Sequence, residues 1–198
     1  MGAYINKSLC GVKYYQTGFV RKRINNPPNV ECKGLLFTIG GGNARNASLL
    51  KKWIQASEKL PKDLYPIKVV CGQLMSEEDK IGIKKIIHEG IIFYDHVKNM
   101  DHLMQESRAI VCMGGYNTLV EALSLKKPIL SFPTDAYGDQ DFQVQRFFER
   151  GLLIKGNVNW SVEEIANEMH AQYWNTEDID IFVNDYDDSN TAKQMYDY

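Results

Sequence analysis

Short apolar runs alternate with amphipathic stretches along most of this chain, and this alternation constrains its fold more than any other feature. Runs typical of buried strands cover residues 35–39, 67–71, 91–94, 109–113, 129–132 and 152–154. Helix-like stretches follow them. Repeated strand–helix–strand units predict parallel strands with right-handed crossovers, and near-continuous apolar strands predict helices on both sheet faces. We therefore expect an α/β domain with a doubly wound, Rossmann-like parallel sheet.

Several residues predict where the helices begin and end. Ser76 is typical of an N-cap, and the helix after it is expected to run to about residue 89 and end at Gly90. Ser161, with acidic residues in the following turn, predicts the start of the last helix of the domain. A terminal helix is expected after residues 187–189. Trp53 has helical spacing and is expected in the core.

The two ends of the chain do not follow the alternation. Residues 14–20 resemble one strand with a glycine kink, and residues 25–29 resemble a linker. Residues 171–198 hold seven acidic residues and one lysine, so they form an acidic tail. We expect three parts: residues 1–34, an α/β domain over 35–170, and the tail over 171–198.

Charge and composition exclude several classes of protein. The net charge of -2 lacks the basic excess of a nucleic-acid binder, and no apolar run reaches the roughly 18 residues of a membrane span. The first nine residues do not resemble a signal peptide. Four separated cysteines (Cys10, Cys32, Cys71 and Cys112) are expected to be reduced thiols of a cytoplasmic protein. Outside the tail the chain is slightly basic, which fits either an anionic ligand such as phosphate or an ordinary solvated surface.

The first of two glycine-rich loops follows the strand at 35–39. Ligands of doubly wound sheets bind outside the carboxyl ends of the strands, where this loop is expected. Gly40, Gly41 and Gly42, followed by Asn43, would let backbone N–H groups approach an anion without obstruction by Cβ atoms. The loop lacks the later glycine of a dinucleotide fingerprint and the G-K-[ST] of a P-loop. A tight turn that needs glycine is the alternative.

The second glycine-rich loop follows the strand at 109–113 and opens a helix. It consists of Gly114, Gly115, Tyr116, Asn117 and Thr118. Asn117 or Thr118 could cap the helix, donate to a phosphate oxygen, or do both. Two glycine-led helix starts in one sheet favour phosphate binding.

Glu121 lies three residues beyond Thr118, within the helix. An acidic side chain there is suited to accept hydrogen bonds from a ribose diol. An ordinary surface glutamate stabilised by the helix dipole is the alternative.

The stretch 112–133, CMGGYNTLVEALSLKKPILSFP, is followed by Asp139 and Gln140 and then by Gly151 and Leu152. This series resembles the donor-binding signature of glycosyltransferase family 28, which includes the peptidoglycan N-acetylglucosaminyltransferase and the monogalactosyldiacylglycerol synthases. The resemblance covers about residues 15–170 and is most specific over 112–152. It implies the C-terminal half of a glycosyltransferase B fold.

The resemblance also implies which residues hold the diphosphate of a UDP-sugar. One group would bind it directly: Gly114, Gly115, Tyr116, Asn117 and Thr118. A second group would approach it from the opposite side: Gly41, Gly42 and Asn43. The family generally stabilises the departing diphosphate with helix dipoles and N–H groups, so neither a metal nor a cofactor is expected.

The resemblance also implies which residues bind the remaining parts of the UDP-sugar. Glu121 would accept the ribose hydroxyls, and Asp139 and Gln140 would bind the sugar hydroxyls. Main-chain groups near Val97 would bind the uracil edge, and Met100 would pack beside it. Ordinary helix core is the alternative for Met100.

The chain departs from the family pattern in its loops and its length. Tyr116 stands where the family often has Ser or Ala, and Asn43 and Ala44 replace a more usual Ser-x-Gly. A complete enzyme has a second, N-terminal domain that binds the acceptor and usually supplies the catalytic base. Residues 15–23 resemble the crossover between the two domains, so 1–34 is expected to be an interdomain segment and linker. The chain is then an excised half or one subunit of a split enzyme.

The resemblance therefore implies an inverting glycosyltransferase that moves a hexosyl or N-acetylhexosaminyl group to a hydroxyl acceptor. Its catalytic base is expected outside this chain. A nucleotide-sugar epimerase or hydrolase is one alternative, for which His96 and Glu121 are the candidate acid and base. A non-catalytic interaction module is the other.

The expected partners are a UDP-sugar and an acceptor domain or subunit, with at most peripheral membrane contact and no nucleic acid. An aromatic patch beside basic residues 21–23 could also mediate self-association. It would comprise Tyr14, Tyr15, Phe19 and Tyr116.

Overall fold

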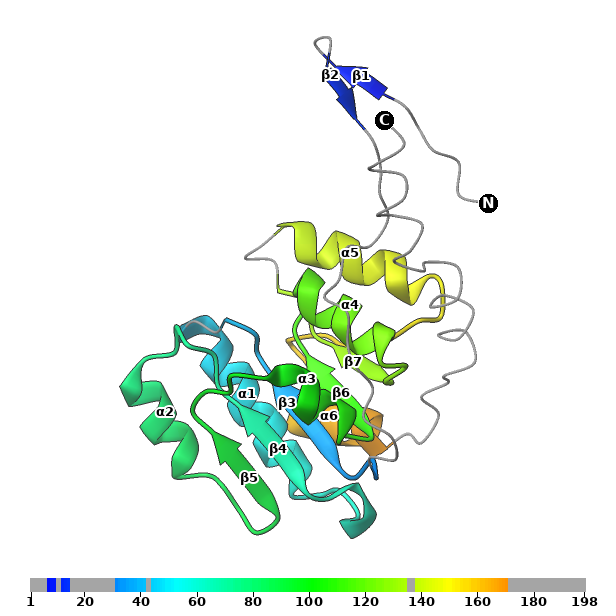
Figure 1. The fold of residues 1–198 in the computed structure, drawn as a ribbon. Coiled ribbons are helices and arrows are strands. Elements are labelled where there is room, and N and C mark those ends of the chain that lie inside the picture. The colour runs from blue at the N-terminus through cyan, green and yellow to red at the C-terminus, as the bar shows by residue number, and fades with distance from the viewer. Residues whose placement is uncertain (1–6, 10–11, 15–30, 42–43, 135–137, 171–198) are drawn as a thin grey trace.

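The computed structural model describes residues 7–9, 12–14, 31–41, 44–134 and 138–170 (Figure 1). Six strands form one parallel sheet in the order β5-β4-β3-β6-β7-β8. They are β3 (Leu35–Thr38), β4 (Ile67–Val70), β5 (Ile91–Tyr94), β6 (Ala109–Cys112), β7 (Ile129–Ser131) and β8 (Ile154–Lys155). The chain winds outward from β3 to one edge and from β6 to the other. The expected doubly wound α/β fold is confirmed.

Helices cover both faces of this sheet (Figure 1). One apolar cluster joins the sheet to α1 (Ala44–Ser57), α2 (Glu77–Lys84) and α6 (Val162–His170). A second cluster joins the opposite face to α3 (Met100–Gln105), α4 (Tyr116–Ser124) and α5 (Gly138–Phe148). A short 3-10 helix, η1 (Lys62–Leu64), precedes β4. Strands covered on both sides are mostly apolar at successive positions, which explains the near-continuous apolar runs in the sequence.

Neighbouring residues of one strand belong to different apolar clusters. In β3, Leu35 and Phe37 belong to the first cluster, whereas Leu36 belongs to the second. Trp53 of α1 is fully buried in the first cluster, as expected, with its ring centroid 6.0 Å from that of Phe37 and 5.3 Å from that of Phe132. These aromatic contacts fix α1 against the centre of the sheet.

The serine N-caps predicted for α2 and α6 are both present. Ser76 Oγ accepts a hydrogen bond from Asp79 N–H at 3.1 Å and begins α2. At α6, Ser161 Oγ accepts from Glu164 N–H at 3.2 Å, and the Glu164 carboxylate accepts from Ser161 N–H at 2.7 Å. This reciprocal capping box lowers the pKa of Glu164, because the backbone N–H stabilises its charged form.

Two element boundaries were predicted wrongly. Helix α2 ends at Lys84 instead of about residue 89, and the chain then places His88 Nε2 2.8 Å from Ser57 Oγ of α1. Gly90, expected to cap α2, instead has φ +88° in the turn before β5. The last strand is 154–155 instead of 152–154, because Leu152 and Leu153 are buried ahead of it in the core.

The flanking segments are described only in part. A separate antiparallel pair joins β1 (Lys7–Leu9) to β2 (Val12–Tyr14). Of the strand predicted over 14–20, only Tyr14 falls in a described strand, and residues 15–20 lie outside the described part. The acidic tail and its expected helix also lie outside it. Within the described segments, no helix is both long and apolar enough to cross a membrane.

Gly34 provides a test of this fold. It has φ +66°, and a Cβ atom there would overlap the carbonyl oxygen of Pro66, which accepts the Leu35 N–H of β3. We expect Gly34→Ala to lower the free energy of unfolding by about 3 kcal/mol or more. Urea denaturation measures this effect. The matched control, Gly82→Ala within α2, should be neutral or stabilising by up to ~1 kcal/mol, because only the flexible Lys51 ammonium is close. Equal losses in both variants would contradict the prediction.

Candidate functional site

The candidate site lies where the winding of the chain changes direction. β3 and β6 are adjacent and parallel, and Thr38 pairs in register with Cys112. The loops that leave these two strands therefore begin at the same level, side by side at the carboxyl edge of the sheet. Ligands of open α/β sheets bind in the crevice at such a point. The structure brings the two glycine-rich loops together there.

The first loop is described as far as Gly41. Gly40 has φ +65°, a conformation that favours glycine, and its N–H lies 3.3 Å from Thr38 Oγ1. The Gly41 carbonyl accepts a hydrogen bond from Leu74 N–H at 2.9 Å, and Gly41 is exposed. Gly42 and Asn43 lie outside the described residues, and α1 begins directly after them at Ala44. Their expected contact with phosphate stays a prediction.

The second loop leads directly into α4. The N-cap is Gly115, with φ −65° and ψ 123°, and no side chain caps it. The expectation that Asn117 or Thr118 caps this helix is wrong, because the helix already begins at Tyr116 and both residues lie in its first turn. The first turn of an α-helix presents N–H groups that its own carbonyls do not bind. An uncapped helix start at the edge of a sheet suits an anionic ligand.

Gly114 and Gly115 have different surroundings. A Cβ atom on Gly114 would lie 2.7 Å from Val144 Cγ2 and 3.3 Å from the Gln140 carbonyl oxygen, both in α5. A Cβ atom on Gly115 would meet nothing nearer than Thr118 Oγ1, at 3.9 Å. Gly114 is therefore needed for packing of the loop against α5. Gly115 is open on its outer side, where a ligand could approach the backbone.

Gln140 is the described polar side chain that α5 places at this loop. Its Oε1 lies 3.4 Å from Thr134 Oγ1, and its Cβ would be 3.2 Å from a Cβ on Gly114. Asp139 also belongs to α5, but only its backbone is described. The structure thus brings Gln140 to the second loop, and its expected binding of sugar hydroxyls stays a prediction.

Two residues of α4 have distinctive positions. Glu121 is half-buried and lies in the second turn, with no acidic residue in the first turn. This position weakens the helix-dipole interpretation, because that interaction fades beyond the first turn, and the expected ribose contact of Glu121 stays a prediction. Tyr116 is 36% exposed, and burial raises the pKa of its phenol. A tyrosine phenol is protonated near neutral pH even at its ordinary pKa, so the Tyr116 hydroxyl is able to donate a hydrogen bond.

Val97 and Met100 lie after β5, at the edge of the sheet. Both are half-buried and pack against the second apolar cluster, so Met100 contributes to the core at the start of α3. β5 is two positions from β3, which corresponds to about 10 Å at ordinary strand spacing. His96 is exposed, with a ring nitrogen 3.2 Å from Gln73 Nε2.

Leu74 and Val144 also lie at the two loops, and no pattern in the sequence identified either residue. Leu74 is 76% exposed and bonds through its N–H to Gly41, so it forms an apolar rim on the first loop. Val144 is fully buried against Gly114. Of the expected aromatic patch, Tyr116 is exposed, whereas Tyr15 and Phe19 lie outside the described residues. Nowhere in the described ranges do three or more His, Cys, Asp or Glu side chains gather as a metal site requires.

Comparison with protein families gives one match that spans most of the chain. The profile of the glycosyltransferase family 28 C-terminal domain matches residues 35–187. These residues begin at β3 and include both glycine loops and all helices from α1 to α6. The match therefore covers the whole described α/β domain.

Two curated relatives and one solved structure agree with this match. A UDP-N-acetylglucosamine–N-acetylmuramyl-(pentapeptide) pyrophosphoryl-undecaprenol N-acetylglucosamine transferase of Clostridium novyi is 27% identical over 69% of this chain and 38% of its own length. An uncharacterized glycosyltransferase of Methanopyrus kandleri is 23% identical over 61% of this chain and 32% of its own. The crystal structure of Acinetobacter baumannii MurG superimposes with a TM-score of 0.65 at 14% identity, covering 90% of this chain and 55% of that one. The chain spans about a third of the length of both curated relatives.

The two glycines of the second loop give a matched pair of variants. Gly114→Ala should lower the free energy of unfolding by about 3 kcal/mol, because the new methyl group would overlap Val144 and the Gln140 backbone. Gly115→Ala should cost less than about 1 kcal/mol, since its φ suits alanine and the space is open. Chemical denaturation measures both.

A second variant checks the cause of the Gly114 effect. In a Val144→Ala background, the added cost of Gly114→Ala should fall, because the nearest clashing atom is gone. An unchanged cost would show that the contact with Val144 is not responsible.

Proposed function

The chain belongs to the glycosyltransferase family 28 C-terminal domain family, and we propose that it binds the nucleotide-sugar donor, a UDP-sugar, of an inverting glycosyltransferase. Its sheet and helices form the C-terminal half of a glycosyltransferase B fold. The observation that carries the proposal is the uncapped, glycine-led start of α4 beside the first glycine loop. Both lie at the point of the sheet where such folds bind ligands.

The proposed diphosphate site is formed by the start of α4. In the proposed pose, the N–H groups of Tyr116, Asn117 and Thr118 face the phosphates, and the missing Cβ of Gly115 lets the oxygens approach. The helix dipole adds partial positive charge at the same place. The protonated Tyr116 hydroxyl is a further donor. Gly41, with Gly42 and Asn43, would contact the phosphates from the β3 side.

These groups would act most strongly on the leaving group. When the bond between the sugar and UDP breaks, negative charge grows on the diphosphate, and fixed donors aimed at that charge lower the barrier. They need no metal ion to do so. Inversion follows if an acceptor hydroxyl attacks the anomeric carbon from the side opposite UDP. The base that removes its proton is proposed to lie outside this chain.

The rest of the donor is proposed to extend in two directions. Glu121 accepts the ribose hydroxyls from the second turn of α4, and backbone groups near Val97 bind the uracil edge, with Met100 beside it. Asp139 and Gln140 bind the sugar hydroxyls from the start of α5. The packing of Gly114 against Gln140 and Val144 supports this last role, because it couples the phosphate loop directly to α5.

The proposal assigns acceptor binding to a partner. Residues 35–170 would be the donor-binding domain, residues 1–34 the crossover segment and linker, and 171–198 an acidic tail. An acceptor domain or separate subunit would face the loops at the carboxyl edge of the sheet. Tyr116 and Leu74 are exposed apolar groups on that edge. We place the protein in the cytoplasm, where nucleotide sugars are available.

Nucleotide titration tests the donor assignment. The chain should bind UDP and UDP-N-acetylglucosamine more tightly than GDP or NAD, and Gly115→Ala should weaken UDP binding at least fivefold because its Cβ would occupy the approach to the phosphates. Isothermal titration calorimetry measures these affinities. Val144→Ala, a change behind the loop, is the control and should affect UDP affinity less. Preference for GDP or NAD would overturn the assignment, and robust sugar transfer by the chain alone would overturn the half-enzyme proposal.

Glu121 gives a sharper test of the ribose contact. Glu121→Ala should weaken UDP binding by about 1.5–3 kcal/mol, the range for hydrogen bonds to a charged group. It should weaken 2′-deoxy-UDP binding clearly less, because one hydroxyl partner is already missing. Calorimetry on both ligands, with circular dichroism to confirm folding, measures the difference. Equal losses for the two nucleotides would remove Glu121 from the ribose site.

A further inference from the structure

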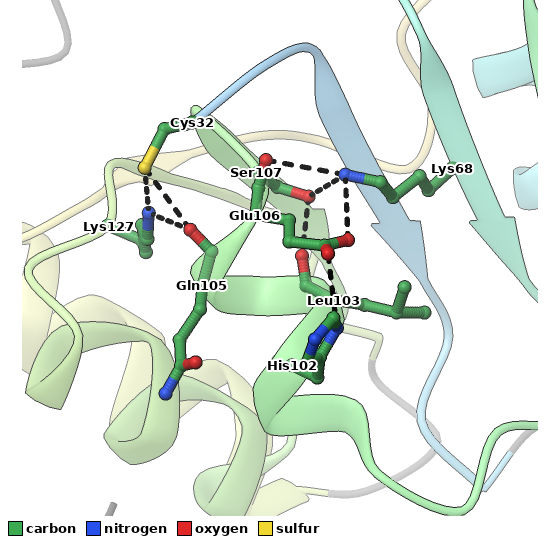
Figure 2. Close-up of polar contacts among 8 residues, drawn as sticks. All are labelled: Cys32, Lys68, His102, Leu103, Gln105, Glu106, Ser107 and Lys127. Carbon is green, nitrogen blue, oxygen red and sulfur yellow. Dashed lines mark hydrogen bonds and ion pairs between the residues drawn. The ribbon is translucent and has the colours of Figure 1, made fainter. Parts of the chain in front are cut away.

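A compact polar cluster lies at the amino ends of the strands, opposite the candidate site (Figure 2). Cys32, three residues before β3, donates from its Sγ to the Gln105 carbonyl oxygen at 3.2 Å. The Lys127 ammonium, two residues before β7, donates to the same oxygen at 2.7 Å and to Cys32 Sγ at 3.0 Å. A sulfur, a nitrogen and an oxygen from three separate segments thus meet within hydrogen-bonding distance.

The Lys127 side chain has little freedom to leave this arrangement. Lys127 is only 8% exposed, and its backbone N–H is bound to the Ala122 carbonyl of α4. The Gln105 carbonyl and Cys32 Sγ hold its ammonium from one side (Figure 2). Cys32 itself is exposed, so an oxidant in solution reaches the sulfur. The thiolate is the form of cysteine that attacks peroxide.

The other described cysteines lack both properties. Cys71 and Cys112 are buried in the strand ends, and burial raises their pKa values to about 11 and about 12. They therefore stay protonated and inaccessible under conditions in which Cys32 reacts. These two thiols serve as internal controls within the same molecule.

We propose that Cys32 and Lys127 form a peroxide-sensitive pair that oxidation converts into a covalent sulfur–nitrogen cross-link. The Cys32 thiolate attacks hydrogen peroxide, so an S–O bond forms, the O–O bond breaks, and hydroxide leaves. Sulfur is oxidised by two electrons and peroxide is reduced. The hydroxide takes a proton from the Lys127 ammonium and becomes water. The resulting amine attacks the sulfenic sulfur, the S–N bond forms, and the S–O oxygen departs as a second water with the amine proton.

The cross-link would join two segments that are far apart in the sequence. Residue 32 is where the segment proposed as the interdomain linker meets β3, and residue 127 lies in the turn between α4 and β7. The bond closes a long loop, which restricts the unfolded chain and stabilises the fold. It also fixes the end of the linker against the donor domain.

Peroxide treatment followed by peptide mapping tests this proposal. The chain carrying Cys10→Ser, which removes a thiol able to form a disulfide with Cys32, is treated with hydrogen peroxide at mildly alkaline pH. Mass spectrometry should find a peptide pair joining residues 32 and 127, with a combined mass lower by two hydrogen atoms. Dithiothreitol should release it. The treated protein should also unfold at a higher temperature than the untreated one.

Matched lysine variants locate the nitrogen. Lys126→Arg should give the same cross-link as the parent, whereas Lys127→Arg should give none and leave a Cys32 sulfenic acid that dimedone traps. If Lys127→Arg does not fold, mapping of the parent protein still decides. A Cys32 that stays reduced, oxidises no faster than Cys71 and Cys112, or accumulates only sulfenic or higher acids in the parent would overturn the proposal.

Discussion

The parallel pairing of β3 with β6 is the constraint on which the candidate site depends. These strands are far apart in the sequence, and their pairing lets the chain wind outward in both directions from the middle of the sheet. The register that sets Thr38 opposite Cys112 ends both strands at one level, so two loops and two helix starts open onto the same edge. A shift of register would separate the loops along the strands and would also disturb which residues of β3 face each apolar cluster.

Packing behind the second loop also fixes the position of α5 relative to that loop. Gly114 allows the loop to lie against Val144 and Gln140 without a gap, while Gly115 keeps the outer side open. Adjacent glycines therefore serve different purposes, one in packing and one in access to the backbone. The same contact sets Gln140 relative to the start of α4. The packing of Gly114 against α5 thus links the proposed phosphate site to the proposed sugar site.

Much of this could be predicted from local pattern. The apolar runs predicted the strands of the sheet, and Ser161 with Glu164 predicted the capping box of α6. The failures share a cause, since they depend on contacts between residues far apart in the chain. Helix α2 ends early where His88 meets Ser57, and the need for glycine at 114 comes from α5. No local pattern reports either contact. The position of Glu121 in the second turn likewise required the observed start of α4 at Tyr116.

At the amino end of the sheet, the cost of burying two lysine ammonium groups is offset by hydrogen-bond and ion-pair partners. Lys68 and Lys127 are both largely buried there, and burial lowers the pKa of Lys68, an effect that the nearby Lys127 charge reinforces and Glu106 opposes. The carbonyls of Gln105 and Glu106 accept hydrogen bonds from these ammonium groups, and the Glu106 carboxylate forms an ion pair with Lys68 at 3.7 Å (Figure 2). Buried charges persist only when such partners are fixed in place. The turn after α3 supplies those partners, and the Gln105 carbonyl among them also binds the Lys127 ammonium that lies beside Cys32.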